Sequence, residues 1–256
     1  MPSKKPAEAV KEHVRETYGK IAQGFLEETS AMSCCATASC CQGPTGCSLG
    51  SGDPISAAGL KPGQTVLDLG SGAGLDCLTA ATIVGPQGHV IGVDMTSEMV
   101  ALANENARRS GFANVEFRLG EIERLPVDDG QVDAVVSNCV INLSPDKSVV
   151  FTEAFRVLKP GGVLTISDIV THGQLPSEVK ADPQAWSACV AGALEEAEYL
   201  ERIQKVGFRD VQVLDRAKVP WGALEKCCSS EDGAAGEKDE AVELLSVTVV
   251  ARKPAS

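Results

Sequence analysis

The stretch Val66-Leu67-Asp68-Leu69-Gly70-Ser71-Gly72-Ala73-Gly74 decides the fold of this chain. An apolar run ends in three glycines at alternate positions, and glycine permits a sharp turn at which the backbone approaches a ligand closely. We therefore expect a strand over residues 65–69 and a helix that starts at Leu75. Asp94 ends the next apolar run, where a carboxylate can hold ribose hydroxyls. This pattern predicts a site for a nucleoside cofactor.

Strands and helices alternate along the rest of the chain, which indicates a doubly wound α/β sheet. The predicted strands, five of them parallel and followed by a final pair, cover residues 65–69, 90–93, 115–118, 132–137, 162–168, 211–214 and 244–252. The predicted helices cover residues 7–25, the segment from Leu75, residues 97–110 before Gly111, 147–158 and 198–206. Lys159-Pro160-Gly161-Gly162 is expected to stop the fourth of these helices.

The composition narrows the class of protein. With 256 residues, 43% of them hydrophobic, the chain can bury one sizeable core. Its net charge of −12 argues against nucleic acid as a partner, since phosphate binding needs a basic surface. The start Met1-Pro2-Ser3-Lys4-Lys5-Pro6 does not resemble a secretory signal, and no apolar run has spanning length. The sequence predicts a cytoplasmic protein that binds no membrane.

The chain carries ten cysteines, an unusual number for a cytoplasmic protein. Thiols stay reduced in the cytosol, so the cysteines indicate a metal, metalloid or redox site rather than a disulfide framework. Thiolates prefer soft ions, which favours a thiophilic substrate. A zinc site is the main alternative, although the sequence lacks Cys-x-x-Cys spacing and has three histidines. The cysteines are Cys34, Cys35, Cys40, Cys41, Cys47, Cys77, Cys139, Cys189, Cys227 and Cys228.

Individual cysteines also have simpler interpretations. Cys139 and Cys189 are equally compatible with small buried apolar residues. Cys77 lies in the first turn of a predicted helix, where we expect a packing or redox role rather than ligation. Cys227 and Cys228 could be an incidental exposed pair.

Four regions are expected along the chain. Residues 1–58 hold the first helix and a cysteine-rich arm, and residues 59–170 form the cofactor-binding core. Residues 171–197 form a substrate cap, in which Asp182-Pro183 marks a helix start. Residues 198–256 complete the core and include an insertion over residues 221–241 that is acidic at 229–240.

The glycine turn, with Asp68 ahead of it, resembles motif I of the class I S-adenosylmethionine-dependent methyltransferases. Val93-Asp94-Met95-Thr96, Gly120-Glu121-Ile122-Glu123-Arg124-Leu125-Pro126 and Leu158-Lys159-Pro160-Gly161-Gly162 resemble the successive motifs of that superfamily. The resemblance implies a seven-stranded Rossmann-like sheet whose last strand is antiparallel. It also implies that Glu121 and the Ile122 amide contact the adenine of S-adenosylmethionine. The full cofactor set that it implies is Asp68, Gly70, Ser71, Gly72, Gly74, Asp94, Met95, Glu121, Ile122 and Asn138.

A narrower resemblance concerns the cysteines. Gly46-Cys47-Ser48, Ser137-Asn138-Cys139-Val140-Ile141-Asn142-Leu143 and Cys189-Val190-Ala191-Gly192-Ala193 closely resemble the arsenite S-adenosylmethionine methyltransferases. In that family cysteine thiolates hold trivalent arsenic, which implies Cys47, Cys139 and Cys189 as the catalytic ligands here. Further arsenic capture or relay is expected from Cys34, Cys35, Cys40, Cys41, Cys227 and Cys228.

Arsenic(III) has three acceptor positions and a lone pair. Three thiolates can therefore hold it while the lone pair faces the methyl group at about 3 to 3.5 Å, without a general base. The expected function is arsenic detoxification by methylation of arsenite, methylarsenite or their thiol conjugates, with glutathione or thioredoxin as reductant. One alternative is C- or O-methylation of a small organic molecule such as a quinone. A second is a non-enzymatic protein that sequesters metalloids.

Overall fold

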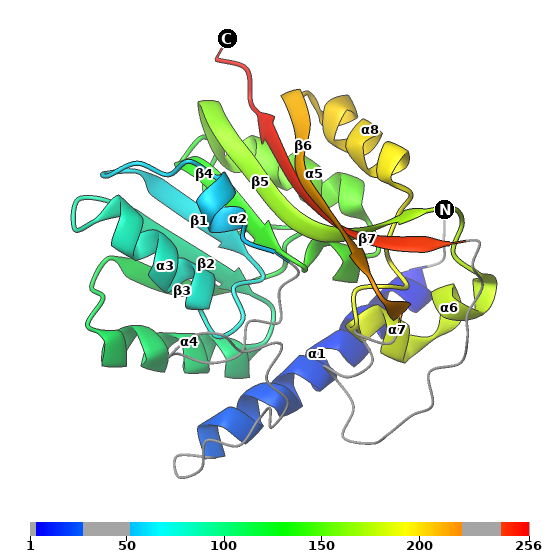
Figure 1. Cartoon of the computed structure of the whole chain (residues 1–256). Coiled ribbons are helices and arrows are strands. Elements are labelled where there is room, and N and C mark those ends of the chain that lie inside the picture. The colour runs from blue at the N-terminus through cyan, green and yellow to red at the C-terminus, as the bar shows by residue number, and fades with distance from the viewer. Residues whose placement is uncertain (1–3, 28–51, 222–241, 256) are drawn as a thin grey trace.

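The computed structural model describes residues 4–27, 52–221 and 242–255, which form a seven-stranded sheet with helices on both faces (Figure 1). The strand order is β3-β2-β1-β4-β5-β7-β6. The strands are β1 Thr65–Leu69, β2 His89–Asp94, β3 Val115–Leu119, β4 Val132–Asn138, β5 Leu158–His172, β6 Arg209–Val219 and β7 Glu243–Arg252. β1 to β5 are parallel, and β7 is antiparallel to both β5 and β6. This arrangement confirms the predicted fold.

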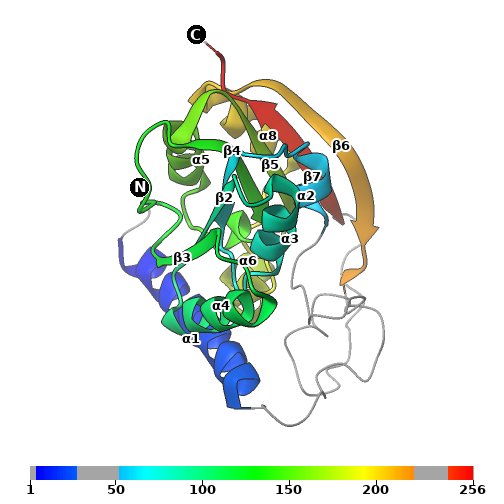
Figure 2. The ribbon, with the colours of Figure 1, turned by 90° about the vertical axis from the view of Figure 1, so that its left-hand side faces the viewer.

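The helices cover the two faces in separate groups (Figure 2). α2 Pro54–Ala57 and α3 Leu75–Val84 bury small side chains against β1, β2 and β4. On the other face, α5 Lys147–Val157 and α8 Glu196–Val206 meet where Phe151 packs edge-on against Tyr199, with ring centroids 5.4 Å apart. None of the described helices is long and apolar enough to span a membrane.

The first helix, α1 Lys4–Glu27, lies at the carboxyl ends of the parallel strands. Its Ala22 packs with Met99 and Leu102 of α4 Ser97–Ser110. Val14, further toward the start of α1, is buried with residues that follow β4 and β5. In open α/β sheets the ligand crevice lies at these strand ends, so α1 is placed over the expected site.

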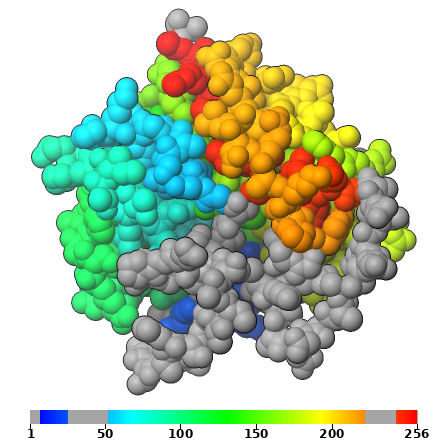
Figure 3. Space-filling model, in the orientation of Figure 1, coloured from blue at the N-terminus to red at the C-terminus, as the bar shows by residue number. Residues whose placement is uncertain are grey.

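Two strands differ from the sequence-based expectation. β5 begins at Leu158 and runs to His172, longer than the predicted 162–168, because Leu158 already pairs with Val132 before the register shifts. Proline is tolerated at such an irregularity. β6 is also longer than the predicted 211–214, and it pairs with β7 along most of its length. It is an edge strand, exposed on the surface beside β7 (Figure 3), so its polar side chains hid its full length from a search for apolar runs.

The cap contains two short helices, α6 Ser177–Ala181 and α7 Pro183–Ser187. The Asp182 side chain accepts a hydrogen bond from the Gln184 amide and caps α7, as the Asp-Pro pair predicts. The short helix α2 was not predicted from the sequence, and its only strong signals are Asp53 as a cap and Pro54 at its first position.

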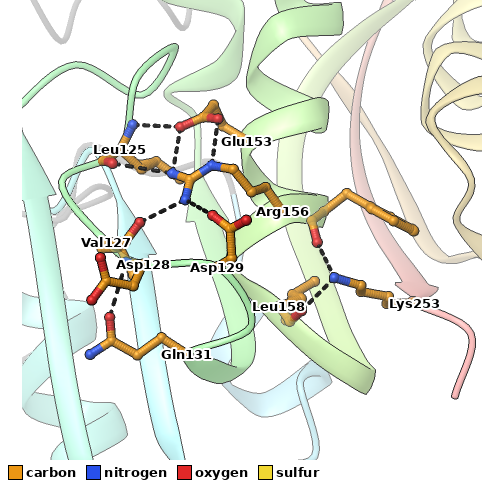
Figure 4. A network of polar contacts seen from close by, with 10 residues as sticks. Leu125, Val127, Asp128, Asp129, Gln131, Glu153, Arg156, Leu158 and Lys253 are labelled. Carbon is orange, nitrogen blue, oxygen red and sulfur yellow. Dashed lines mark hydrogen bonds and ion pairs between the residues drawn. The ribbon is translucent and has the colours of Figure 1, made fainter.

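A salt-bridged network holds the segment after β3 in place (Figure 4). Arg156 of α5 pairs with Glu153 at 2.7 Å and with Asp129 at 2.7 Å, and it donates to the carbonyl oxygens of Leu125 and Val127. The Glu153 carboxylate in turn accepts the Leu125 amide. One fork-shaped guanidinium thus fixes the path of the turn that starts at Gly120.

Candidate functional site

The glycine turn after β1 is closely packed on one side and open on the other. Gly70, Gly72 and Gly74 have φ values of 65°, 50° and 85°, in the left-handed region that favours glycine. A Cβ atom on Gly70 would overlap Val140, and one on Gly74 would overlap Phe117. A Cβ on Gly72 would meet no atom of the described residues within 4 Å. The turn therefore presents its backbone to open space at Gly72, as a bound cofactor requires.

Two carboxylates flank this turn. Asp94 ends β2, and its oxygens accept the amides of Gly72 and Thr96, both at 2.9 Å. Asp68 in β1 is buried, and burial together with the neighbouring Asp76 raises its pKa well above the usual value. Burial also raises the pKa of Asp94.

The chemistry of this donor set fits S-adenosylmethionine. A concentration of buried carboxylates suits a ligand that carries a sulfonium and an ammonium, because the cation compensates their desolvation. The Ser71 hydroxyl, in the same turn, is buried and has no hydrogen-bond partner among the described residues, so a polar ligand could satisfy it.

Cys77, for which a packing or redox role is expected, is buried. Its side chain is fully buried in α3, and its thiol donates a hydrogen bond to the Asp68 carboxylate at 3.2 Å. Burial and the nearby Asp68 charge raise the pKa of the Cys77 thiol well above the usual value. The thiol is therefore protonated, which makes it a poor ligand for a metalloid.

The other expected cofactor residues lie at or just after the carboxyl ends of the parallel strands. Glu121 follows β3 and pairs with Lys11 at 2.9 Å and Arg15 at 3.4 Å, both on α1. Next to Glu121, Ile122 is buried. Asn138 ends β4, and its amide donates to the Gly52 carbonyl oxygen at 3.1 Å and to Asp76 at 3.0 Å. Met95 packs against the cluster of apolar residues that contains Cys139 and Cys189.

Cys139 and Cys189 lie together in that cluster. Cys139 follows β4, and Cys189 follows α7 in the cap. The Cys189 thiol donates to the Cys139 carbonyl oxygen at 2.7 Å, and neither cysteine is in a disulfide. Val14 of α1 packs in the same cluster, and Tyr18 donates from its hydroxyl to the Ser187 carbonyl oxygen at 3.2 Å.

Both of these cysteines have a left-handed backbone. Their φ values are 56° for Cys139 and 62° for Cys189, and Asp210 is the one other non-glycine residue with positive φ among those described. Such a conformation persists in a bulky residue only where its surroundings hold it, and it is concentrated at functional sites. The Val140 side chain, next to Cys139, occupies the space that a Cβ atom on Gly70 would need. This contact places Cys139 beside the cofactor turn.

Sequence reasoning missed four buried polar residues near the two cysteines: Asn142, Lys147, Asp168 and Tyr199. Burial lowers the pKa of Lys147 to about 8 and raises that of Asp168 to about 7. The Tyr199 hydroxyl donates to the Asp168 carboxylate at 3.1 Å. Asp146-Lys147 matched a helix start, and Asp146 does cap α5, so nothing in the sequence indicated a buried lysine.

The remaining predicted ligands, Cys34, Cys35, Cys40, Cys41, Cys47, Cys227 and Cys228, lie outside the described residues. Trp221 and Val242, which flank residues 222–241, pack against the cluster that holds Cys139 and Cys189. Within the described part of the chain, no group of three histidine, cysteine or acidic side chains is placed to hold a metal ion.

Known proteins match this chain over most of its length. A methyltransferase domain family matches residues 60–207. The arsenite methyltransferase of Halobacterium salinarum is 41% identical, over 97% of this chain and 68% of that protein. The arsenite methyltransferase of Aquipseudomonas alcaligenes is 46% identical over 62% of this chain, which spans only 48% of that relative's length.

A solved structure extends the match to three dimensions. The crystal structure of an arsenic(III) S-adenosylmethionine methyltransferase from Chlamydomonas reinhardtii has a TM-score of 0.65 and 32% identity to this chain. The superposition covers 94% of this chain and 73% of that one. The strand order, the glycine turn and these matches lead to one conclusion: the chain belongs to the arsenite methyltransferase family, within the S-adenosylmethionine-dependent methyltransferases.

Proposed function

We propose that this chain methylates arsenic(III) held by the thiolates of Cys139, Cys189 and Cys47, with S-adenosylmethionine as the methyl donor. The observation that carries the proposal is the pairing of Cys139 with Cys189. The two residues are 50 positions apart in the sequence, yet they share one buried cluster beside the cofactor turn. Both have a strained backbone, which is unexpected for cysteines that serve only as small core residues.

Arsenite reaches the site as neutral arsenous acid, so an acidic protein does not repel it. Each arsenic–sulfur bond forms as a thiol proton and an arsenic-bound hydroxide leave together as water. Three such exchanges release three waters and leave the arsenic lone pair free. The apolar surroundings of Cys139 and Cys189, including Val14 and Leu143, favour this loss of water.

The third proposed ligand, Cys47, lies outside the described residues. Gly52 lies next to β4, because its carbonyl oxygen accepts the Asn138 amide. Cys47 precedes Gly52 by five positions, which an extended chain covers in at most about 18 Å. This short distance along the chain from the neighbour of Asn138 supports Cys47 as the third ligand. We propose accessory arsenic capture or relay for Cys34, Cys35, Cys40, Cys41, Cys227 and Cys228.

S-adenosylmethionine, when bound, supplies an electrophilic methyl group on a sulfonium. The residues of the chain have the tasks of orientation and exclusion of water. Gly70, Ser71, Gly72 and Gly74 offer the backbone of the turn, and Asp94 offers its remaining lone pairs to the ribose. The other residues that we propose for the cofactor are Asp68, Met95, Glu121, Ile122 and Asn138.

A reductant follows from the electron count. Transfer of a methyl cation to the arsenic lone pair raises the formal oxidation state of arsenic by two. Two thiols return these two electrons when they join as a disulfide, so we propose glutathione or thioredoxin as the partner. Such thiols are abundant in the cytoplasm, which is the compartment that we propose.

The direct test incubates the protein with arsenite, S-adenosylmethionine and glutathione and separates the arsenic species. We expect methylated arsenicals from the wild type and a loss of at least about a hundredfold in the Cys139→Ser and Cys189→Ser variants. Binding of S-adenosylmethionine, measured by calorimetry, should be unchanged in both. Normal yields from either variant would overturn the proposed ligands, and arsenite binding without any methylated product would indicate sequestration instead.

A further inference from the structure

We propose that Asn142 and Lys147 are positioning residues that hold Cys139 and Cys189 at the spacing required to share one arsenic atom. The inference rests on the proposed function and adds two residues that touch neither the arsenic nor the cofactor in it. Their contacts join three separate segments: the turn after β4, the end of β5 and the cap.

Asn142 connects the two cysteines directly. It follows Cys139 by three positions in the 3-10 helix Ile141–Leu143, and its side chain is fully buried. The amide donates to the Cys189 carbonyl oxygen at 3.2 Å and to the Ile169 carbonyl oxygen at 2.6 Å. One amide group therefore fixes the cap cysteine relative to β5 and to the turn that carries the other cysteine.

The cap also rests on the main chain of Asn142. A Cβ atom on Gly192 would lie 2.0 Å from the Asn142 carbonyl oxygen and 2.7 Å from the Trp186 ring. Only glycine permits this approach, so the segment after Cys189 is pressed onto the turn after Cys139. The segment after Cys189 and the turn after Cys139 cannot move relative to each other without loss of these contacts.

Lys147 contacts both the turn after Cys139 and the cap. It is the first residue of α5 and is nearly fully buried, and its ammonium donates to the Ser144 carbonyl oxygen at 3.0 Å and to the Asn142 carbonyl oxygen at 3.4 Å. The same ammonium lies 5.9 Å from the centre of the Trp186 ring. The Trp186 carbonyl oxygen accepts the Cys189 amide at 2.9 Å. A buried cation thus holds both the turn after Cys139 and the residue that anchors Cys189.

These contacts explain how two strained cysteines are kept in place. A left-handed backbone at a non-glycine residue relaxes unless neighbouring groups prevent it. Asn142 donates a hydrogen bond to the Cys189 carbonyl oxygen, and Lys147 donates to carbonyl oxygens of the turn after Cys139. Loss of either residue should let the two thiols drift apart while each thiol stays chemically intact.

The test uses phenylarsine oxide, a trivalent arsenical that joins two thiols with release of one water. The parent protein is the full chain in which seven cysteines become serine, so that Cys77, Cys139 and Cys189 remain. The substituted residues are Cys34, Cys35, Cys40, Cys41, Cys47, Cys227 and Cys228. Tight binding of one phenylarsine oxide per parent chain is expected, and failure of the parent to bind would overturn the proposed function and this inference together.

The variants Asn142→Leu, the milder Asn142→Ser and Lys147→Met are then compared with the parent. We expect the dissociation constant for phenylarsine oxide to rise about tenfold, as for loss of one or two buried hydrogen bonds. The affinity for S-adenosylmethionine and the alkylation rates of the single thiols should stay within about twofold. Lys147→Arg, which keeps the charge, should lose less affinity than Lys147→Met.

Asn114 provides a matched control. Asn114 lies just before β3. Its amide also donates to two carbonyl oxygens in the loop before β2, those of Gly85 at 2.9 Å and Gly88 at 3.4 Å. Asn114→Leu should lower the melting temperature without any change in phenylarsine oxide binding. Unchanged binding in the Asn142 and Lys147 variants, or an equal loss in Asn114→Leu, would overturn the positioning role while the function of the cysteines still stands.

Discussion

The Cys189 thiol donates a hydrogen bond to the main-chain carbonyl oxygen of Cys139 at 2.7 Å. The two residues therefore contact each other before any ligand arrives, although they come from the cap and from the end of β4. In the proposed function arsenic takes the place of the thiol proton, so this hydrogen bond would be lost on binding. The Cys139 carbonyl oxygen would then need another donor, from the protein or from water.

A serine at position 189 should separate ligation from folding. The hydroxyl of Cys189→Ser can still donate to the Cys139 carbonyl oxygen, so the free energy of unfolding should change by less than about 1 kcal/mol. Arsenic binding should be lost, because a hydroxyl is a poor ligand for a soft ion. Urea unfolding together with an arsenite binding assay checks both halves. A large loss of stability would show that the thiol has a packing role that serine cannot replace.

The left-handed backbone of Cys139 predicts that a glycine variant is more stable than an alanine variant at this position, the reverse of the order inside a helix. At φ 56° alanine is strained and glycine is not, so Cys139→Gly should be about 1 kcal/mol more stable than Cys139→Ala. At Cys77, inside α3, alanine should be about 1 kcal/mol more stable than glycine. Thermal or urea unfolding of the four variants gives the comparison. The same order at both positions would mean that the backbone at Cys139 is not held in this conformation.

Asp168 predicts a pH-dependent loss of stability. Burial raises its pKa from 3.8 to about 7 in the folded protein, so the folded state binds the proton more tightly than the unfolded chain. Its contribution is present below about pH 4 and is lost as the pH rises toward 7, on the order of 2 kcal/mol between about pH 5 and about pH 8. Lys147, whose pKa is lowered to about 8, begins to titrate only at the upper end of this range.

The measurement compares urea unfolding of the wild type and the Asp168→Asn variant at several pH values. Asparagine cannot ionise, and it can still accept from the Tyr199 hydroxyl. The variant should therefore gain stability relative to the wild type as the pH rises. A constant difference across the range would contradict the raised pKa.

The contacts of Arg156 predict that the ion-pair network around it affects the affinity for the cofactor. Arg156→Lys keeps the charge but cannot hold Glu153, Asp129 and two carbonyl oxygens at once. We expect a loss of about 1 to 2 kcal/mol in the free energy of unfolding. The dissociation constant for S-adenosylmethionine should rise several-fold, because the turn with Glu121 loses its support. Thr152→Ser, on the exposed side of α5, is the control, and equal cofactor affinity in both variants would refute the link.

The sheet could be derived from the sequence because its signals are local. Apolar runs marked β1 and β2 to within a residue, and Gly111 marked the end of α4. Only residues 211–214 of β6 could be found in this way, since most of its side chains face solvent and its strand pairing depends on β7, which follows a long insertion.

The candidate site was only partly predictable for the same reason. Cysteines at positions 139 and 189 could be named from their residue type and motif context. The left-handed backbone of both could not, because cysteine carries no signal for positive φ. Asn142 and Lys147 lie in a stretch whose polar residues resemble an ordinary helix start, and their burial depends on tertiary contacts that the sequence does not reveal.

The helix α1 contains no cysteine, yet it contacts both the turn after β3 and the cap. Lys11 pairs with the acidic turn after β3, while Tyr18 bonds to the cap two residues before Cys189. Because Lys11 and Tyr18 lie seven residues apart on one helix, these two contacts are mechanically coupled. Any displacement of α1 would therefore move the turn that carries Glu121 and the cap together.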